Sequence, residues 1–125
     1  MVEVTSFVNW DALEKEFVRD GVERVGFRGD DTLLVMNWLQ PGMTPGPHSH
    51  PFEQIAVIVQ GTARFHIGDK TYDAGPGSMI RIPPDVEHWA EVIGDEPVMN
   101  LDVFNPIRED YMHLVEHQNG NFEEG

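Results

Sequence analysis

Residues 42–61 read GMTPGPHSHPFEQIAVIVQG and place two histidines between a turn-rich start and an apolar end. In an extended chain alternate side chains point the same way, so His48 and His50 can face one point inside a barrel. Gln54 has the same parity and could supply a third group if the strand stays regular through Pro51. Imidazole is a favoured ligand of several divalent metals. By itself the pair is weak evidence for a metal site, because the two histidines could equally lie exposed in a loop.

A second stretch, residues 77–92, reads GSMIRIPPDVEHWAEV and places His88 soon after a Pro-Pro turn. Together the two stretches resemble the motifs of the cupin superfamily. The first motif is G, five residues, HxH, three or four residues, E, six residues and G, and residues 42–61 fit its spacing. The second is G, five residues, PxG, two residues, H, three residues and N, which residues 77–92 fit. The resemblance covers about residues 30–106 and implies a small β-barrel with a metal site.

The chain departs from these motifs at three positions. Asp85 replaces the turn glycine, which a residue tolerant of left-handed backbone can do cheaply, and Val92 replaces the final asparagine. Gln54 stands at the glutamate ligand position, whereas Glu53 has the opposite parity and should point away from the metal. The resemblance implies one divalent ion (Zn, Ni, Mn, Fe or Co) on His48, His50, Gln54 and His88. A site made of the three histidines alone is the alternative.

Ligation by Gln54 would make all four ligands neutral, so a divalent ion would keep its full charge inside the barrel. Such a centre is a strong Lewis acid and favours an anionic ligand such as a carboxylate or an enolate. This charge favours polarising or isomerising chemistry over O₂ activation. An Fe(II)-dependent dioxygenase on the same histidines stays open as an alternative.

A third stretch, residues 101–112, reads LDVFNPIREDYM. Asp102 and Phe104 share one face of a strand, and Arg108 follows a bend from which it could clamp a carboxylate. This ending and the HxHPxEQ stretch resemble small cupins of pectin and alginate breakdown, which open 4,5-unsaturated uronates. The resemblance implies that Asp102 and Arg108 are catalytic and that Phe104 and Arg108 bind substrate. The alternative is a surface Arg108 that pairs with a neighbouring acidic residue.

Three other histidines are assigned no metal. His66 has no partner histidine on its strand, which is more typical of a structural residue. His113 and His117 fit the HxxEH pattern of some zinc peptidases, but that motif needs a large helical scaffold and a distant acidic ligand. We therefore interpret His113 and His117 as solvent-facing residues of a terminal helix.

The spacing of hydrophobic residues along the chain predicts the helices and strands around these motifs. A period of 3.6 predicts a helix over residues 9–20, with Asn9 as its cap and Gly21 at its end. A period of 2 predicts strands at 32–39, 54–59, 62–67, 78–82, 88–93 and 98–104, and a last helix is predicted over 108–117. The predicted fold is all-β: a single-domain cupin over residues 1–125, a double-stranded β-helix or jelly-roll barrel with a core at about 30–106 and short N-terminal and C-terminal helices.

The amino-acid composition limits which partners and which metal ligands the protein can have. A net charge of −14 argues against a nucleic-acid partner, which requires a surplus of Lys and Arg. The absence of cysteine restricts any metal to N and O ligands. No apolar run reaches the roughly 18–20 residues that cross a bilayer, and no signal peptide is visible, so a cytoplasmic protein without a membrane partner is expected.

We therefore expect a metal-dependent enzyme with a small-molecule substrate, an anionic sugar- or keto-acid-like compound. A non-catalytic metabolite-binding cupin is a further alternative. Because barrels of this family often pair through their sheets, the resemblance also implies a homodimer.

Overall fold

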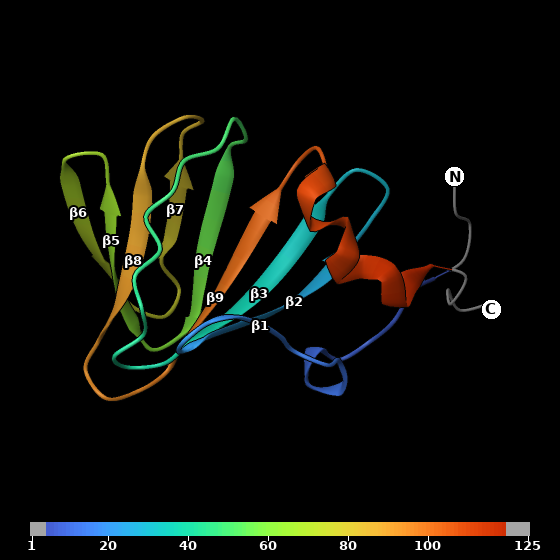
Figure 1. Ribbon diagram of the computed structural model, residues 1–125, viewed down its shortest axis with the longest axis horizontal. Coiled ribbons are helices and arrows are strands. Elements are labelled where there is room, and N and C mark those ends of the chain that lie inside the picture. Colours follow the sequence, from blue (N-terminus) through green and yellow to red (C-terminus); the bar gives the residue numbers. More distant parts are fainter. Residues whose placement is uncertain (1–4, 120–125) are drawn as a thin grey trace.

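Within residues 5–119, the part of the chain that this computed structural model describes, nine strands form two antiparallel sheets (Figure 1). The strands are β1 (Glu16–Arg19), β2 (Val22–Arg28), β3 (Leu33–Leu39), β4 (Gln54–Gln60), β5 (Thr62–Ile67), β6 (Lys70–Ala74), β7 (Met79–Ile82), β8 (His88–Ile93) and β9 (Val98–Phe104). The larger sheet has the order β1-β2-β3-β9-β4-β7, and the smaller one has the order β6-β5-β8. The predicted domain over 1–125 also includes residues 1–4 and 120–125, which lie outside the described part.

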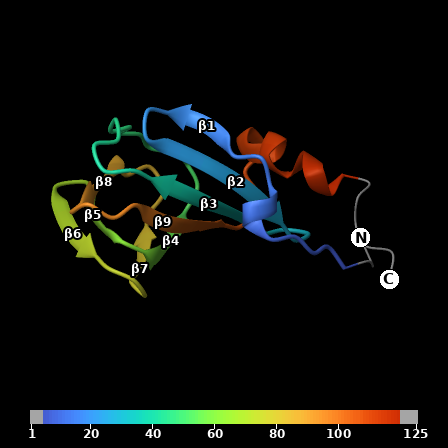
Figure 2. The same cartoon turned by 90° about the horizontal axis from the view of Figure 1, so that it is seen from below.

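Apolar side chains from both sheets pack into a shared buried cluster. Ala56 and Ile58 of β4 are 0% and 1% exposed, and they belong to the same buried cluster as Ala63 and Phe65 of β5. Figure 2 shows the two sheets side by side from below, with the strands of the smaller one at one end. Burial of these side chains holds the sheets together at about 25 cal/mol per Å² of apolar surface. The arrangement confirms the predicted all-β jelly roll.

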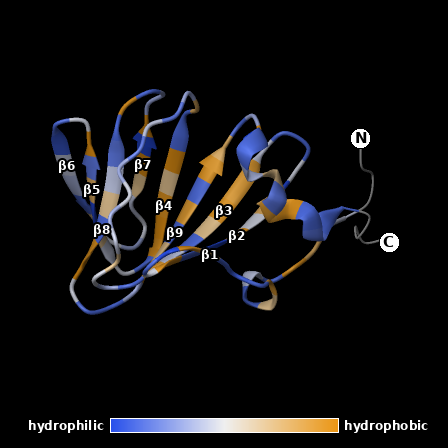
Figure 3. Cartoon of the chain, viewed as in Figure 1, coloured by the Kyte–Doolittle hydropathy of each residue, from blue (hydrophilic) through white to orange (hydrophobic). Residues whose placement is uncertain are grey.

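The six predicted strands are confirmed as β3, β4, β5, β7, β8 and β9, each within one residue at either end. Figure 3 shows that β3 is largely hydrophobic, whereas β9 carries a hydrophilic stretch between hydrophobic ends. Strands β1, β2 and β6 are additions to the prediction. Their side chains are more polar than those of the central strands, which weakens the pattern on which a strand prediction depends.

The predicted helix over residues 9–20 is wrong beyond its first turn. Asn9 caps it as predicted, with Oδ1 accepting from the Asp11 amide at 2.8 Å, but only η1 (Trp10–Ala12) is helical. Residues 16–19 instead form β1, which joins β2 through a two-residue turn at Asp20 and Gly21, where Gly21 has a φ of 82°. An Asp-Gly pair between two strands is a strong hairpin signal. Pairing with β2 outweighs the local helical pattern here.

A short C-terminal helical segment, η2 (Glu109–Gln118), matches the predicted helix over 108–117 and packs against β2. The Gln118 side chain bonds both backbone groups of Arg28, at 2.8 and 2.9 Å. Gly26 lets η2 approach closely, because a Cβ there would lie 2.7 Å from the Cβ of Leu114. This packing brings Tyr111 to the edge of the inter-sheet cavity. No helix in the described residues is long and apolar enough to cross a membrane.

Candidate metal centre and its cavity

Backbone pairing brings the two histidine-bearing segments together. His48 and His50 lie in the connection from β3 to β4, and His88 is the first residue of β8. The His48 amide donates to the His88 carbonyl at 3.1 Å, and the His88 amide donates back at 2.9 Å. The Asp85 amide donates to the His50 carbonyl at 2.7 Å, and Asp85 has a φ of 64°, the left-handed backbone predicted for it. The segments are therefore held in one fixed register.

The three imidazoles share one hydrogen-bonding arrangement. Each Nδ1 lies 2.8 Å from a backbone carbonyl oxygen, that of Gly46 for His48, Phe52 for His50 and Val86 for His88. A carbonyl oxygen can only accept, so each Nδ1 carries the proton and each neutral ring keeps a lone pair on Nε2. Such second contacts are what metal-bound histidines usually have.

One potential ligand atom from each of the three rings lies within 4.8 Å of the others. His88 Nε2 is buried without a hydrogen-bond partner among the described residues. Burial lowers the pKa of His48 and lowers that of His88 to about 4, so both rings are neutral at physiological pH. A buried lone pair without a donor is unfavourable. The cluster therefore fits a metal ion, and the structure brings the three predicted histidines together.

Gln54 is oriented by its neighbours. Its amide nitrogen donates to Asp102 Oδ1 at 2.8 Å, which turns Oε1 toward His50 Nε2 at 3.1 Å. Because the His50 proton is on Nδ1, two acceptors face each other, and a cation shared between them would turn this contact into an attraction. Glu53 points elsewhere and pairs with Arg81 on the surface, in line with its opposite parity. Gln54 could therefore hold the ion together with the histidines.

Asp102 lies in the cavity wall at the centre of a network of side-chain amides. Its Oδ1 accepts from Gln54 at 2.8 Å and from Asn100 at 2.9 Å, and its Oδ2 accepts from Asn37 at 3.0 Å. Desolvation raises the pKa of Asp102 to about 6, although these three hydrogen bonds oppose the rise. The carboxylate therefore orients Gln54 and stands next to the metal position.

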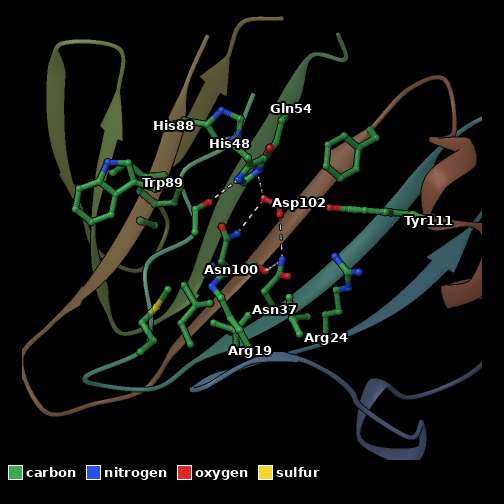
Figure 4. A pocket seen from close by; sticks show the side chains of 18 residues that line it. Arg19, Arg24, Asn37, His48, Gln54, His88, Trp89, Asn100, Asp102 and Tyr111 are labelled. Carbon is green, nitrogen blue, oxygen red and sulfur yellow. Dashed lines mark hydrogen bonds between the residues drawn. The ribbon is translucent and has the colours of Figure 1, made fainter. Parts of the chain in front are cut away.

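The cavity lies between the sheets and has a volume of about 110 Å³. Figure 4 shows His48 and His88 at one end, Arg19 and Arg24 at the other, and Asp102 between them. Across the sheet, Arg24 pairs in register with Asn37, and Asn37 pairs with Asn100. A row of polar side chains thus runs from the arginines to the candidate metal centre.

Phe104 and Arg108 lie at different depths. Phe104 is 1% exposed and lines the cavity, as a substrate contact would. Arg108 is 5% exposed but is not among the lining residues, and its guanidinium carbon lies 4.8 Å from the Phe104 ring centroid and 3.9 Å from that of Tyr111. It donates to both carboxylate oxygens of Asp110, at 3.1 and 2.7 Å. Arg108 therefore stands behind the aromatic wall.

The other three histidines lie away from the cluster. His66 pairs with Glu91 and stacks on a tryptophan ring of β8. His113 pairs with Glu16 at 2.7 Å. His117 is half-buried and contacts a carbonyl oxygen of β2 at 2.7 Å, so its predicted solvent-facing position is only partly correct. Among the described residues, the cluster of His48, His50 and His88 is the one metal-type group found.

Sequence reasoning missed several cavity residues: Arg19, Arg24, Asn37, Asn100 and Tyr111. A signal existed for two of them. Asn37 is a lone amide in an apolar strand, and Asn100 is two residues before Asp102, on the same face. The arginines gave no signal, because their segment was predicted to be a helix or was left unassigned.

Comparison with known proteins matches residues 38–104 to the family described as the cupin domain. The structure of KdgF from Halomonas sp. superposes with a TM-score of 0.74 at 26% identity, covering 85% of this chain and 98% of that one. A predicted oxalate decarboxylase from Thermotoga maritima gives 0.72 at 20% identity, covering 81% and 99%, which shows a shared fold. H2HPP isomerase of Bacillus subtilis is 27% identical over 97 residues, or 77% of this chain. The chain spans 38% of the length of that curated relative.

Proposed function

The chain belongs to the cupin family, and we propose that it is a metal-dependent enzyme that opens or isomerises a small anionic sugar- or keto-acid-like substrate. One divalent ion would lie on His48, His50, Gln54 and His88. The observation that carries the proposal is the orientation of Gln54, whose side-chain amide links the half-buried carboxylate of Asp102 to Nε2 of His50. Ligand site and carboxylate therefore form one unit facing the cavity.

A metal ion bound to these neutral ligands would supply Lewis acidity toward a carbonyl or hydroxyl oxygen of the substrate. The protein residues supply orientation. The backbone carbonyls that hold each Nδ1 keep the three free nitrogens pointing to one place. The same contacts raise the basicity of the ligands.

Asp102 is the proposed proton carrier. Opening a 4,5-unsaturated uronate breaks the bond between C1 and the ring oxygen. The C1 hydroxyl loses its proton and becomes an aldehyde, while C4 gains a proton and C5 becomes a ketone, so the reaction is an isomerisation without an oxidant or reductant. The position of Asp102 in the cavity wall, beside the side-chain amide of Gln54, supports this role, because a carboxylate there could accept and return that proton. The amides of Asn37 and Asn100 hold it in position while it does so.

Phe104 is proposed as an apolar contact for the substrate, since it lines the cavity next to Asp102. The predicted role of Arg108 as a carboxylate clamp stays a prediction. Its burial and its pairing with Asp110 favour a positioning role, in which it fixes the rings of Phe104 and Tyr111.

Two likenesses support the reaction class. The ending at residues 101–112 resembles that of uronate-opening cupins. The curated relative in Bacillus subtilis is named an isomerase, which agrees with chemistry that moves protons rather than electrons.

The test is an assay of the metal-loaded protein on unsaturated uronates. Loss of the C4–C5 double bond is followed by ultraviolet absorbance and corrected for the spontaneous reaction. We expect acceleration that is unchanged under anaerobic conditions, and Asp102→Asn should lower kcat at least about 100-fold while keeping the metal. No acceleration on any unsaturated uronate would overturn the substrate class. A requirement for O₂ would favour the Fe(II) dioxygenase, and binding without turnover would favour a metabolite-binding cupin.

A further inference from the structure

Two arginines lie in the cavity at the end away from the histidines (Figure 4). They are Arg19 at the end of β1 and Arg24 on β2. The whole chain has eight Lys and Arg residues and a net charge of −14. Cations are therefore scarce in this protein, and two of them face the same small cavity.

Arg24 is held in place with part of its guanidinium free. Its Nε and Nη2 both donate to Glu16 Oε1, at 3.2 and 2.9 Å, and its guanidinium carbon lies 4.5 Å from the Tyr111 ring centroid. The side chain is 16% exposed. The contacts with Glu16 and with the Tyr111 ring thus fix the orientation of the Arg24 guanidinium and of its remaining N–H donors.

Arg19 has no carboxylate partner within residues 5–119. Its Nε donates to the Thr44 carbonyl at 2.7 Å, and its other donors make no hydrogen bond there. Partial burial and the nearby charge of Arg24 lower its pKa. Glu16 pairs with Arg24, so the guanidinium group of Arg19 is left with a positive charge that an anion could neutralise.

Gly46 connects Arg19 to the metal centre. A Cβ on Gly46 would lie 2.5 Å from Arg19 Cζ and 2.8 Å from Nη2, so the guanidinium rests where a side chain would otherwise be. The Gly46 carbonyl accepts from His48 Nδ1 at 2.8 Å. The backbone that orients one proposed ligand is thus the backbone on which Arg19 rests.

We propose that Arg19 and Arg24 bind a carboxylate of the substrate at the end of the cavity opposite the histidines. The substrate class is therefore a small molecule with a carboxylate at one end and a carbonyl or hydroxyl oxygen at the other. The carboxylate would lie at the arginines and the oxygen at the histidines, with the polar row through Asn37 and Asn100 between them. Guanidinium groups match a carboxylate through paired hydrogen bonds. This assignment rests on the proposed function for the histidine end of the cavity, but its own binding residues are distinct from the metal ligands.

The test is equilibrium binding by titration calorimetry, using protein as purified with its metal content measured. The probes are galacturonate, its uncharged methyl ester and inorganic phosphate. Wild-type protein should prefer galacturonate to the ester by at least about tenfold, as expected for hydrogen bonds to a charged group. Arg19→Gln and Arg24→Gln should lose that preference with metal content unchanged, and Arg64→Gln, the same charge change at an exposed site on β5, should keep it.

Gly46→Ala is a complementary variant that changes no charge. Its methyl group should displace the Arg19 guanidinium and reduce galacturonate binding several-fold. Arg24→Gln also breaks the pair with Glu16, so Arg19→Gln is the deciding variant should Arg24→Gln fold poorly.

Retention of the full preference in Arg19→Gln, or no preference in the wild type, would overturn the assignment. Phosphate binding as tight as galacturonate, and equally dependent on Arg19, would overturn the carboxylate as its ligand. The readout needs no turnover. Arginine-dependent binding without any uronate reaction would sink the proposed function alone, and a uronate reaction insensitive to Arg19 would sink this inference alone.

Discussion

The neutral side-chain amide of Gln54 lies between the imidazole of His50 and the carboxylate of Asp102, so a negative charge at this position would act on both neighbours. Gln54→Glu would put a second carboxylate 2.8 Å from Asp102 Oδ1, where an amide donor now lies. We expect the variant to keep the ion, or bind it more tightly, because the new ligand is anionic. Activity should fall about tenfold or more, since the centre loses one positive charge and Asp102 gains a like-charge neighbour.

Metal analysis and kcat on the same preparation check this prediction. Gln60→Glu, the same change at an exposed position on β4, is the matched control and should behave as the wild type. Full activity with metal retained in Gln54→Glu would show that the neutral ligand has no mechanistic role.

The three histidines give a second prediction at this scale. His48→Ala, His50→Ala or His88→Ala should each remove most of the bound metal, because each deletes one of the converging nitrogens. His113→Ala should keep a normal ion count, since His113 lies on η2 and pairs with Glu16. Elemental analysis of the four variants decides the matter. A normal count in His88→Ala would disprove the ligand assignment.

At the scale of elements, the packing of η2 on β2 depends on one missing side chain. Gly26→Ala would place a Cβ 2.7 Å from the Cβ and 3.2 Å from the carbonyl oxygen of Leu114, so η2 would have to shift. We expect a loss of about 1–3 kcal/mol of unfolding free energy, the usual cost of overpacking.

Thermal unfolding measures this loss, which corresponds to several degrees in Tm for a chain of this size. Gly29→Ala is the control, because nothing lies within 4 Å of its added Cβ. Metal content should stay normal in Gly26→Ala, since η2 supplies no ligand. An unchanged Tm in Gly26→Ala would show that the helical segment adapts without cost.

The whole molecule should be stabilised by its metal. The proposed ligands come from the β3–β4 connection, from β4 of the larger sheet and from β8 of the smaller one, so a bound ion links both sheets. Binding to the folded state alone adds about 2.7 kcal/mol at a free concentration of 100 times Kd.

Calorimetry with and without a chelator checks this, and the chelated protein should melt several degrees lower. His88→Ala should show no chelator effect. An unchanged transition in protein known to carry metal beforehand would contradict the prediction.

Local sequence patterns were sufficient to predict the central strands and the histidine cluster. Both depend on local facts: strand parity fixes which side chains share a face, and turn chemistry fixes where strands end. His48, His50 and His88 lie where the motif spacing puts them, and Asp85 adopts the left-handed backbone that its position requires. The C-terminal helical segment also lies where the sequence predicts a helix, although it is a 3-10 helix with non-helical backbone at Val115.

The end of the cavity that carries the arginines could not be predicted, because it depends on contacts between segments that are distant in the sequence. Residues 16–19 carry a helical period, and their pairing with β2 comes from contacts that no local pattern contains. That pairing brings Arg19 and Arg24 opposite the histidines, while the packing of η2 places Arg108 behind Phe104 and outside the cavity lining. Which cation faces the cavity depends on the register between distant strands and on which helix covers them. The register and the helix packing are set by the free energy of burying the contact surfaces between elements. Each residue contributes only a part of that free energy, so no single residue predicts them.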